Sequence, residues 1–303
     1  TPERFHQRFN VDVRTESEVT AVDTAGKTVT VRHGEETYKE SYDRLVLSPG
    51  AAPIRPAIPG IEENKVFTLR NIPDTYRIYD HIKETAPRSC AVIGAGFIGL
   101  EMAENLAERG VHVTVVEGAS HVMPPIDMDM AHQVHNYIRA QGIDLYLGQT
   151  CTAMDKDGVI LKDGRKIPAD MVILSIGVRP DTGFLKDSGI ELGARGEILV
   201  NSYMETSAPD VYALGDAASV RHIVSGKQVL IPLASPANKQ GRIVGDNLCG
   251  RKTAYRGSQG TSIMKFFGLT VAVTGEKEES LQAQGRAFCK VITTSASQAG
   301  YYP

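Results

Sequence analysis

The sequence predicts an α/β fold built around a parallel sheet. An apolar segment at residues 90–93 is followed by a glycine-rich turn, an amphipathic run that ends at Arg109-Gly110, and a second apolar segment at 111–116. This β-α-β order places two strands side by side and parallel. Residues 171–176 form another wholly apolar run, which ends at Gly177 and has the length and composition of a central parallel strand.

Before the glycine-rich turn, strands alternate with turn residues. We expect strands at 11–22 and 28–32 that turn at Ala25-Gly26, and a short strand at 42–47. The proline-rich stretch that follows, residues 53–60, is typical of an extended link between domains. A helix is predicted from residue 73 to about residue 85.

After the second strand the elements alternate again. A helix is predicted at 127–141, because apolar residues recur on one face and Gly142 follows as a stop. A strand at 143–147 comes next, and residues 159–167 predict a hairpin that turns at Asp163-Gly164.

The last third predicts one more buried strand and then a different texture. Residues 210–216 are a strand that ends in Gly-Asp, the end at which ligands bind in open α/β sheets. We expect a helix from about residue 236 to residue 249. Beyond a boundary near residue 256 the pattern alternates like an antiparallel sheet. The expected elements there are strands at 263–267, 270–274 and 287–293 and a helix at 277–284.

The turn at residues 94–99 has the sequence Gly-Ala-Gly-Phe-Ile-Gly, a G-x-G-x-x-G motif between a strand and a helix. Gly94 permits the tight turn, Gly96 lets a pyrophosphate approach the backbone, and Gly99 lets the helix pack closely on the strand. The helix N-terminus then faces the anion. A chance glycine-rich turn is the alternative, but the flanking strand, helix and second strand favour dinucleotide binding.

Glu117 ends the second strand, 18 residues after Gly99. An acid at this position is placed to accept hydrogen bonds from both hydroxyls of an adenosine ribose. Its charge would also repel a 2′-phosphate. The sequence therefore predicts NADH rather than NADPH.

Composition excludes several classes of partner. The 303 residues are 42% hydrophobic and 23% charged, with a net charge of −3. These values are ordinary for a globular protein and offer neither a basic stripe for nucleic acid nor a polybasic segment for a membrane. The four cysteines are widely spaced and show no metal-ligand pattern, so we expect no metal site. Each sits in or beside an apolar run, which predicts small buried hydrophobes and a reducing cytoplasm.

The motifs occur in a familiar order. Ser48-Pro49-Gly50, the glycine motif, the segment 176–180 and the segment 206–216 resemble those of the pyridine nucleotide-disulfide oxidoreductases. Segments 232–242 and 299–303 look like those of coenzyme A disulfide reductases and NADH-dependent persulfide reductases. The resemblance covers the whole chain.

The resemblance implies a domain organisation. A Rossmann-like NADH-binding domain at 66–183 would be inserted in an FAD-binding domain made of residues 1–65 and 184–255. Residues 256–303 would form part of an α+β dimerisation domain of a homodimer. The family's first flavin-binding glycine motif and its redox cysteine would lie upstream of Thr1, and the family continues past Pro303. We therefore expect the sequence to be the central portion of a complete enzyme.

The resemblance also assigns residues to the two cofactors. Beside Glu117 and the glycines, Gly177 would leave backbone exposed for the nicotinamide, although it could simply end a strand. Phe97 could shield the nicotinamide or serve as a core residue. Glu101 could approach the flavin, or it could simply be a first-turn acid that the helix dipole stabilises. Asp216 would bind the FAD ribitol, since a buried aspartate without a partner is costly. The remaining cofactor-binding residues implied are Ile98, Val19, Ser48, Pro49, Gly50, Pro232, Leu233 and Ala234.

For the substrate, Tyr301 and Asn238 match positions that contact coenzyme A. The Tyr301 phenol would assist departure of the CoA thiolate and reach the partner's active site, whereas packing in a dimer sheet is its plain alternative. Gln298 departs from the family, which commonly has a histidine there. The expected activity is reduction of a CoA disulfide, CoA persulfide or polysulfide by NADH through FAD. The alternatives are an NADH oxidase or peroxidase and a nucleotide-binding fragment without catalysis.

Overall fold

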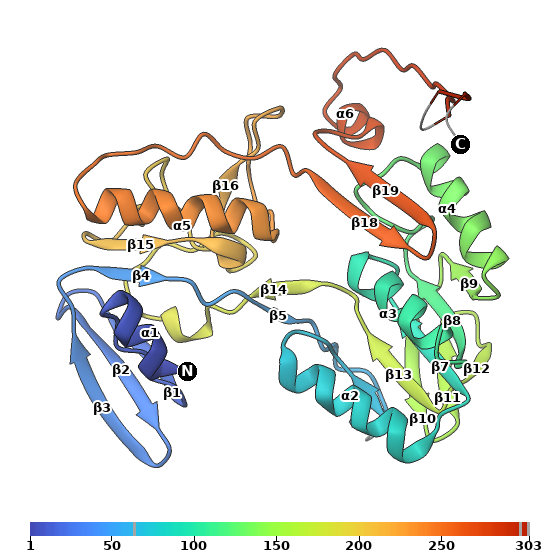
Figure 1. Ribbon diagram of the computed structural model, residues 1–303, viewed down its shortest axis with the longest axis horizontal. Helices are drawn as coiled ribbons and strands as arrows, with labels where there is room; N and C mark the ends of the chain where they lie inside the picture. Colours follow the sequence, from blue (N-terminus) through green and yellow to red (C-terminus); the bar gives the residue numbers. More distant parts are fainter. Residues whose placement is uncertain (63–64, 297–298, 302–303) are drawn as a thin grey trace.

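The computed structural model describes residues 1–62, 65–296 and 299–301. It confirms the α/β class, with helices and strands arranged in two parts that lie side by side (Figure 1). One, the five-stranded part, comprises residues 54–177. The other, the α5 part, comprises residues 1–50 and 181–255. Within the described ranges, no helix is long and apolar enough to cross a membrane.

A five-stranded sheet forms the centre of the first part. Its strand order is β6-β13-β7-β8-β9, and every neighbouring pair is parallel. The sequence predicted four of these strands, although β13 ends two residues before the predicted end, and it missed the two-residue β6. Their bounds are β6 Val66–Phe67, β7 Ser89–Ile93, β8 His112–Glu117, β9 Asp144–Leu147 and β13 Met171–Leu174.

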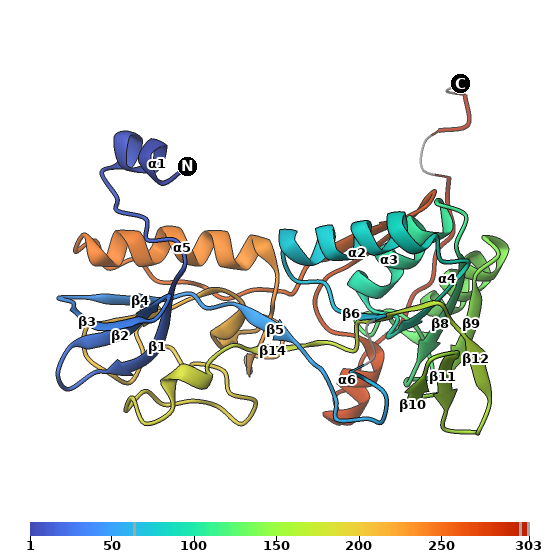
Figure 2. The same cartoon turned by 90° about the horizontal axis from the view of Figure 1, so that it is seen from below.

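Helices cover one face of this sheet and a small antiparallel sheet covers the other (Figure 2). The helices are α2 Ile72–Thr85, α3 Phe97–Ala107 and α4 Met128–Ala140, all close to their predicted positions. The small sheet is β10 Cys151–Asp155, β11 Gly158–Leu161 and β12 Lys166–Pro168. The last two strands are the predicted hairpin; β10 was not predicted.

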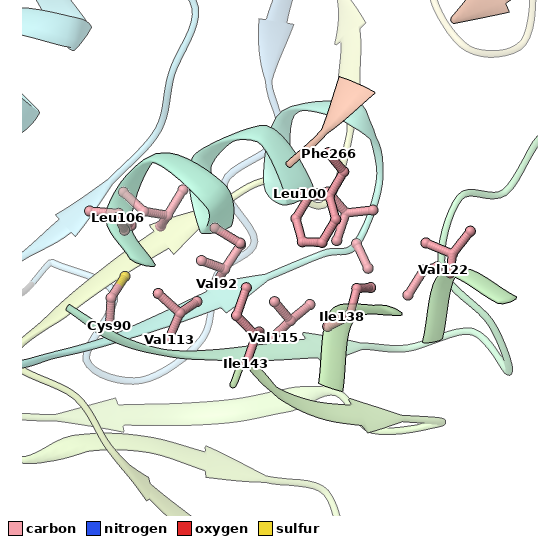
Figure 3. Packing of buried hydrophobic residues seen from close by; sticks show 14 of the residues in the cluster. Cys90, Val92, Leu100, Leu106, Val113, Val115, Val122, Ile138, Ile143 and Phe266 are labelled. Atoms are coloured by element: carbon pink, nitrogen blue, oxygen red, sulfur yellow. The ribbon is translucent and has the colours of Figure 1, made fainter. Parts of the chain in front are cut away.

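Alternation along the strands builds a separate core on each face. In β7, Cys90 and Val92 face α3, where Leu100 and Leu106 are fully buried (Figure 3). Ile93, of opposite parity to Val92, belongs to the core against the small sheet. Burying each such side chain contributes about 1.5–3 kcal/mol. These two cores hold the carboxyl ends of the central strands in place.

Two strands after residue 256 pack onto the same helical face, β18 Ser262–Phe266 and β19 Leu269–Val273. The short helix α6 Glu278–Ala283 lies beside the start of α4, where the Glu278 N–H donates to the Asp127 carboxylate. Phe266 is fully buried in the core with Leu100 and lies edge-on to Tyr137 of α4 (Figure 3). The strand predicted at 287–293 is wrong: among the described residues the segment forms no ladder with another strand, and Val291 is 84% exposed. Alternation alone cannot supply the neighbouring strand that a ladder needs.

The α5 part is built from small sheets and one long helix. An antiparallel sheet is formed by β1 Ser17–Asp23, β2 Thr28–His33 and β3 Glu36–Ser41, with the predicted turn at residues 24–27. The first strand begins six residues later than predicted, because Glu16 adopts a left-handed conformation just before it. Helix α1 Pro2–Phe9 and strand β3 were not predicted.

Strand β4 Leu45–Leu47 pairs in parallel with β15 Val211–Ala213, and α5 Ala234–Leu248 lies against them (Figure 1). A one-turn helix, η2 Gly215–Ala217, follows β15, and η1 Gly183–Leu185 precedes it in sequence. The hairpin β16 Val220–Arg221 and β17 Gln228–Val229 completes this part. Helix α5 begins two residues earlier than predicted.

Two strands run between the parts. They are β5 Ala51–Pro53 and β14 Val178–Pro180, an antiparallel pair that both views place at the centre (Figures 1 and 2). Of the predicted proline-rich link at 53–60, only Pro53 belongs to this pair, because the residues after it lie in the five-stranded part. The domain boundaries implied by the family resemblance stay a prediction.

Candidate functional site

A cleft of about 460 Å³ opens where the central strands end. It is lined by residues that follow β7, β8 and β13, together with the link at Pro56 and the segment after β9. In a parallel sheet this edge, at the point where the strand order reverses, is where ligands bind. Four residues predicted to bind the dinucleotide lie in this cleft: Gly94, Gly96, Glu117 and Gly177.

The glycine-rich turn has the geometry expected of its motif. At Gly94, φ is 104°, and an added Cβ would lie 2.4 Å from the carbonyl oxygen of Ser175. At Gly99 a Cβ would lie 2.0 Å from the carbonyl oxygen of Gly94, so the helix packs directly on the turn. Gly96, by contrast, faces open space. The turn therefore leaves room for a ligand only at its middle glycine.

Glu117 is held by the turn it faces. One carboxylate oxygen accepts a hydrogen bond from the Ala95 N–H, and the other accepts one from the Ala119 N–H, both at 2.7 Å. The carboxylate thus links the end of β8 to the glycine-rich turn. Each carboxylate oxygen has a second lone pair, so the group can still accept from a ligand hydroxyl.

Besides Gly99, three predicted residues on α3 do not line the cleft. Phe97 packs against the hydrophobic core, which favours the structural one of its two expected roles. Ile98 is 39% exposed, and Glu101 is exposed on the same helix. Desolvation, and then the neighbouring Glu104, raise the pKa of Glu101. Whether these side chains meet a cofactor stays a prediction.

A second cleft, of about 720 Å³, lies in the α5 part. It is lined by β1, β2, β4 and η1, and it contains the predicted residues Val19, Ser48 and Pro49. Val19 is 37% exposed, and the role of its backbone in binding adenine stays a prediction. Gly50 lies next to this cleft, and its carbonyl oxygen accepts from the Asp181 N–H.

Asp216 lies in η2, directly after β15. Its carboxylate is half-buried and, within the described ranges, meets neither a donor nor a cation. Burial alone raises its pKa. The neighbouring Gly215 N–H donates to the amide of Gln240 on α5, and a Cβ at Gly215 would lie 3.7 Å from the Ser48 hydroxyl. Asp216 and the second cleft therefore lie together, and a half-buried acceptor without a donor fits a polyhydroxyl ligand.

No side chain caps the free backbone N–H groups at the N-terminus of α5. Leu233 is the N-cap residue, the helix begins at Ala234, and Pro232 precedes them in an extended segment. Uncapped N–H groups at a helix start carry partial positive charge and favour an anionic ligand. The predicted residues at 232–234 are thus in a position that suits an anion.

The two predicted substrate residues are not brought together within this chain. Asn238 is exposed on α5, and Tyr301 is 82% exposed near the end of the chain. The C-terminal end of the chain lies away from α5 in both views (Figures 1 and 2). Gln298, Tyr302 and Pro303 lie outside the described residues.

Sequence reasoning missed Arg70, which joins the two parts. Its guanidinium donates to the Asp181 carboxylate and to the Pro49 carbonyl oxygen, both at 3.0 Å. Its backbone N–H is held by the carboxylate of Asp74 at the start of α2. An arginine in a loop gives no periodic signal, so only the structure reveals that it ties the five-stranded part to the rim of the second cleft.

The cysteines are free thiols with differing environments. Cys90 is buried, which raises its pKa, and Cys151 is partly buried at the wall of the first cleft. Cys249 and Cys289 are exposed, so the expectation that each thiol serves as a buried hydrophobe is wrong for these two. In the part of the chain that the structure describes, no cluster of side chains could hold a metal ion.

Comparison with known proteins identifies the family. The model of the pyridine nucleotide-disulphide oxidoreductases matches residues 3–241. The chain belongs to this family. Both clefts lie within the matched region, and the family supports dependence on FAD and a nicotinamide nucleotide.

Among curated proteins, the chain is 35% identical over 306 aligned positions to a coenzyme A disulfide reductase of Staphylococcus aureus, covering 100% of this chain and 69% of that protein. Among solved structures, it matches the reduced CoADR-RHD of Bacillus anthracis with 48% identity and a TM-score of 0.98. A NAD-dependent persulfide reductase from A. fulgidus matches with 34% identity and a TM-score of 0.96.

Both matches cover 100% of this chain, but they cover only 56% and 57% of the lengths of the two matched chains. A water-forming NADH oxidase from Lactobacillus brevis bound to NADH also matches, with 34% identity and a TM-score of 0.88 over 94% of this chain and 64% of that one. The chain is therefore similar to disulfide and persulfide reductases and also to an oxidase on the same fold.

Proposed function

We propose that the protein passes electrons from NADH through FAD to a CoA disulfide, a CoA persulfide or a polysulfide. The observation that carries this proposal is the match to the CoADR-RHD of Bacillus anthracis over the whole of this chain at 48% identity. The persulfide reductase match extends the substrate class to persulfides. Because the chain spans only 56% and 57% of those two matched chains, the activity is proposed for a protein of their length. A homodimer is its expected assembly.

In this proposal the first cleft binds NADH. The pyrophosphate lies over Gly96, where the turn leaves open space, and the adenosine ribose meets the Glu117 carboxylate. Gly177, three residues after β13, leaves backbone exposed for the nicotinamide. These three contacts order the dinucleotide across the ends of β8, β7 and β13.

The second cleft holds FAD, which when bound relays the electrons between NADH and sulfur. Asp216 accepts from the ribitol hydroxyls, consistent with its half-buried carboxylate that lacks a donor. The α5 N-terminus, with Leu233 and Ala234, directs N–H groups at the edge of the flavin where negative charge develops on reduction. The backbone of Val19 reads the adenine of FAD, while Ser48 and Pro49 line this cleft and Gly50 lies next to it.

The sulfur chemistry needs groups beyond these clefts. A redox cysteine is expected upstream of Thr1, and Tyr301, beside Asn238 of the partner subunit in the expected homodimer, assists departure of the CoA thiolate. The four free thiols favour a reducing compartment, and we propose the cytoplasm.

An NADH oxidase or peroxidase is the second candidate, since the Lactobacillus brevis enzyme matches over 94% of this chain. The two candidates differ in what accepts electrons from the cysteine. In the oxidase, that cysteine would cycle through a sulfenic acid.

Replacing Tyr301 with phenylalanine separates the candidates. In the flavin-loaded protein we expect Tyr301→Phe to slow turnover of CoA disulfide by roughly 10- to 1000-fold, while reduction of the flavin by NADH is nearly unchanged. Tyr76→Phe, at an exposed tyrosine of α2, is the matched control and should change neither rate. Stopped-flow and steady-state assays on one preparation measure both. Unchanged sulfur turnover in Tyr301→Phe would place the oxidase first.

A further inference from the structure

One polar side chain in the dinucleotide cleft has no partner. Gln149 follows β9 and lines the cleft together with Thr150. The oxygen of its amide is buried and accepts no hydrogen bond from any residue that the structure describes. Its backbone N–H donates to the carbonyl oxygen of Glu117 at 3.0 Å, which fixes this segment beside the end of β8.

A buried amide oxygen without a hydrogen-bond donor has an energetic cost. Leaving such an acceptor unsatisfied costs about 1–3 kcal/mol, so native structures rarely retain one that nothing ever meets. The oxygen and nitrogen of a glutamine amide can exchange places by rotation about one bond, so either atom can turn toward the cleft. Gln149 therefore offers one acceptor and two donors to a ligand that fills the cleft.

The position of Gln149 indicates which part of a dinucleotide it meets. The pyrophosphate is expected at the glycine-rich turn after β7, and the ribose at Glu117 after β8. The next strand outward in the sheet is β9, and Gln149 lies just beyond its end. The base attached to that ribose is the only part of the ligand that continues in this direction, because the nicotinamide lies toward β13.

We propose that Gln149 recognises the adenine base of NADH. Adenine carries an amino group at position 6 next to a ring nitrogen, a donor beside an acceptor. The glutamine amide presents the complementary acceptor and donor, the pairing by which glutamine selects adenine in nucleic acids. On the edge that carries position 6 and the ring nitrogen N7, hypoxanthine has two acceptors, the carbonyl oxygen and N7, so either orientation of the amide sets its oxygen against an acceptor.

This inference rests on the proposed binding of NADH, and its test separates the two. Dissociation constants of NAD⁺ and of nicotinamide hypoxanthine dinucleotide are measured by isothermal titration calorimetry, with oxidised nucleotides so that no turnover occurs. The wild-type protein should bind NAD⁺ roughly 5- to 100-fold more tightly than the hypoxanthine analogue. Gln149→Met, of similar shape but without the amide, should lose this preference.

Thr150→Val is the matched control, because it removes a hydroxyl from the same wall of the cleft and should keep the preference. Equal affinity of the wild-type protein for both nucleotides would overturn the assignment of Gln149. So would a Gln149→Met variant whose two affinities fall by the same factor, since that result describes a residue that only shapes the cleft. Binding of neither nucleotide to the wild-type protein would refute the NADH site and this assignment with it.

Discussion

Replacing Glu117 with alanine should collapse the preference for NADH over NADPH. In the structure its carboxylate accepts from the Ala95 and Ala119 N–H groups and lines the dinucleotide cleft. Glu117→Ala removes both backbone hydrogen bonds, which weakens binding of both nucleotides to a similar degree. It also removes the ribose acceptor and the negative charge, and these losses affect the two nucleotides differently.

The size of the differential effect follows from charge and distance. Two unit charges 4 Å apart repel by about 4 kcal/mol at an effective dielectric constant of 20. Glu117 is partly exposed, so screening leaves about 2 kcal/mol against a 2′-phosphate. Losing a charged acceptor for the ribose of NADH adds about 1 kcal/mol. The ratio of the two dissociation constants should therefore fall by roughly 100-fold.

Calorimetric titration of NAD⁺ and NADP⁺ into wild type and variant gives this ratio directly. Asp144→Ala is the matched control, because Asp144 pairs with His112 at the opposite end of the same strands. Adding an arginine next to position 117 should move the ratio further toward NADP⁺. A ratio that is the same in wild type and Glu117→Ala would refute the assignment of this carboxylate to the ribose.

Three further outcomes are expected. Gly99→Ala places a Cβ 2.0 Å from a backbone oxygen and should destabilise the protein by about 1–3 kcal/mol. Gly245→Ala, at a position of α5 where an added Cβ meets no other atom, should stabilise it by about 0.5–1 kcal/mol. Thermal unfolding measures both, and equal changes in melting temperature would contradict the close packing at Gly99. Asp216→Ala should leave the purified protein with little FAD, read from absorbance against protein concentration, and full occupancy would exclude the ribitol contact. Burial lowers the pKa of His135 to about 4, so the unfolded state takes up a proton at a higher pH than the folded state does. The free energy of unfolding should therefore fall by up to about 3 kcal/mol as the pH drops from 6.5 toward 4. His135→Gln should flatten this pH dependence in denaturant titrations, and the same dependence in the variant would count against the role of His135.

The parallel sheet could be predicted because its signals are local. A wholly apolar run such as residues 171–174, or a glycine motif between a strand and a helix, carries its meaning within a few residues. Glu117 follows from the same unit by spacing alone. The glycine geometry at 94 and 99 then agrees with the roles expected from the motif.

Elements that depend on distant partners could not be predicted. Strand β3, residues 36–41, is polar and largely exposed, and only its pairing with β2 makes it a strand. The segment 287–293 is the opposite case: its residues alternate like those of a strand, but among the described residues no neighbouring strand pairs with it. Apolar pattern and pairing are separate requirements, and the sequence shows only the first.

Side-chain contacts across the chain were equally hidden. The link that Arg70 makes to Pro49 and Asp181 joins residues far apart in sequence, and neither residue type nor spacing indicates it. The partnerless amide of Gln149 is recognisable only once its surroundings are known. Exposure of Cys249 and Cys289 likewise depends on which faces the fold covers.

The most direct test of the proposed function is an anaerobic assay of the FAD-loaded protein with NADH and CoA disulfide. We predict that one NADH is oxidised for each disulfide reduced, with release of two CoA thiols, and that NADPH supports this reaction far more slowly. Thiol release is followed with a chromogenic disulfide reagent and NADH by its absorbance. Reduction of the flavin by NADH without release of thiol from CoA disulfide or CoA persulfide, or of sulfide from polysulfide, together with rapid NADH oxidation once oxygen is admitted, would contradict the proposed function.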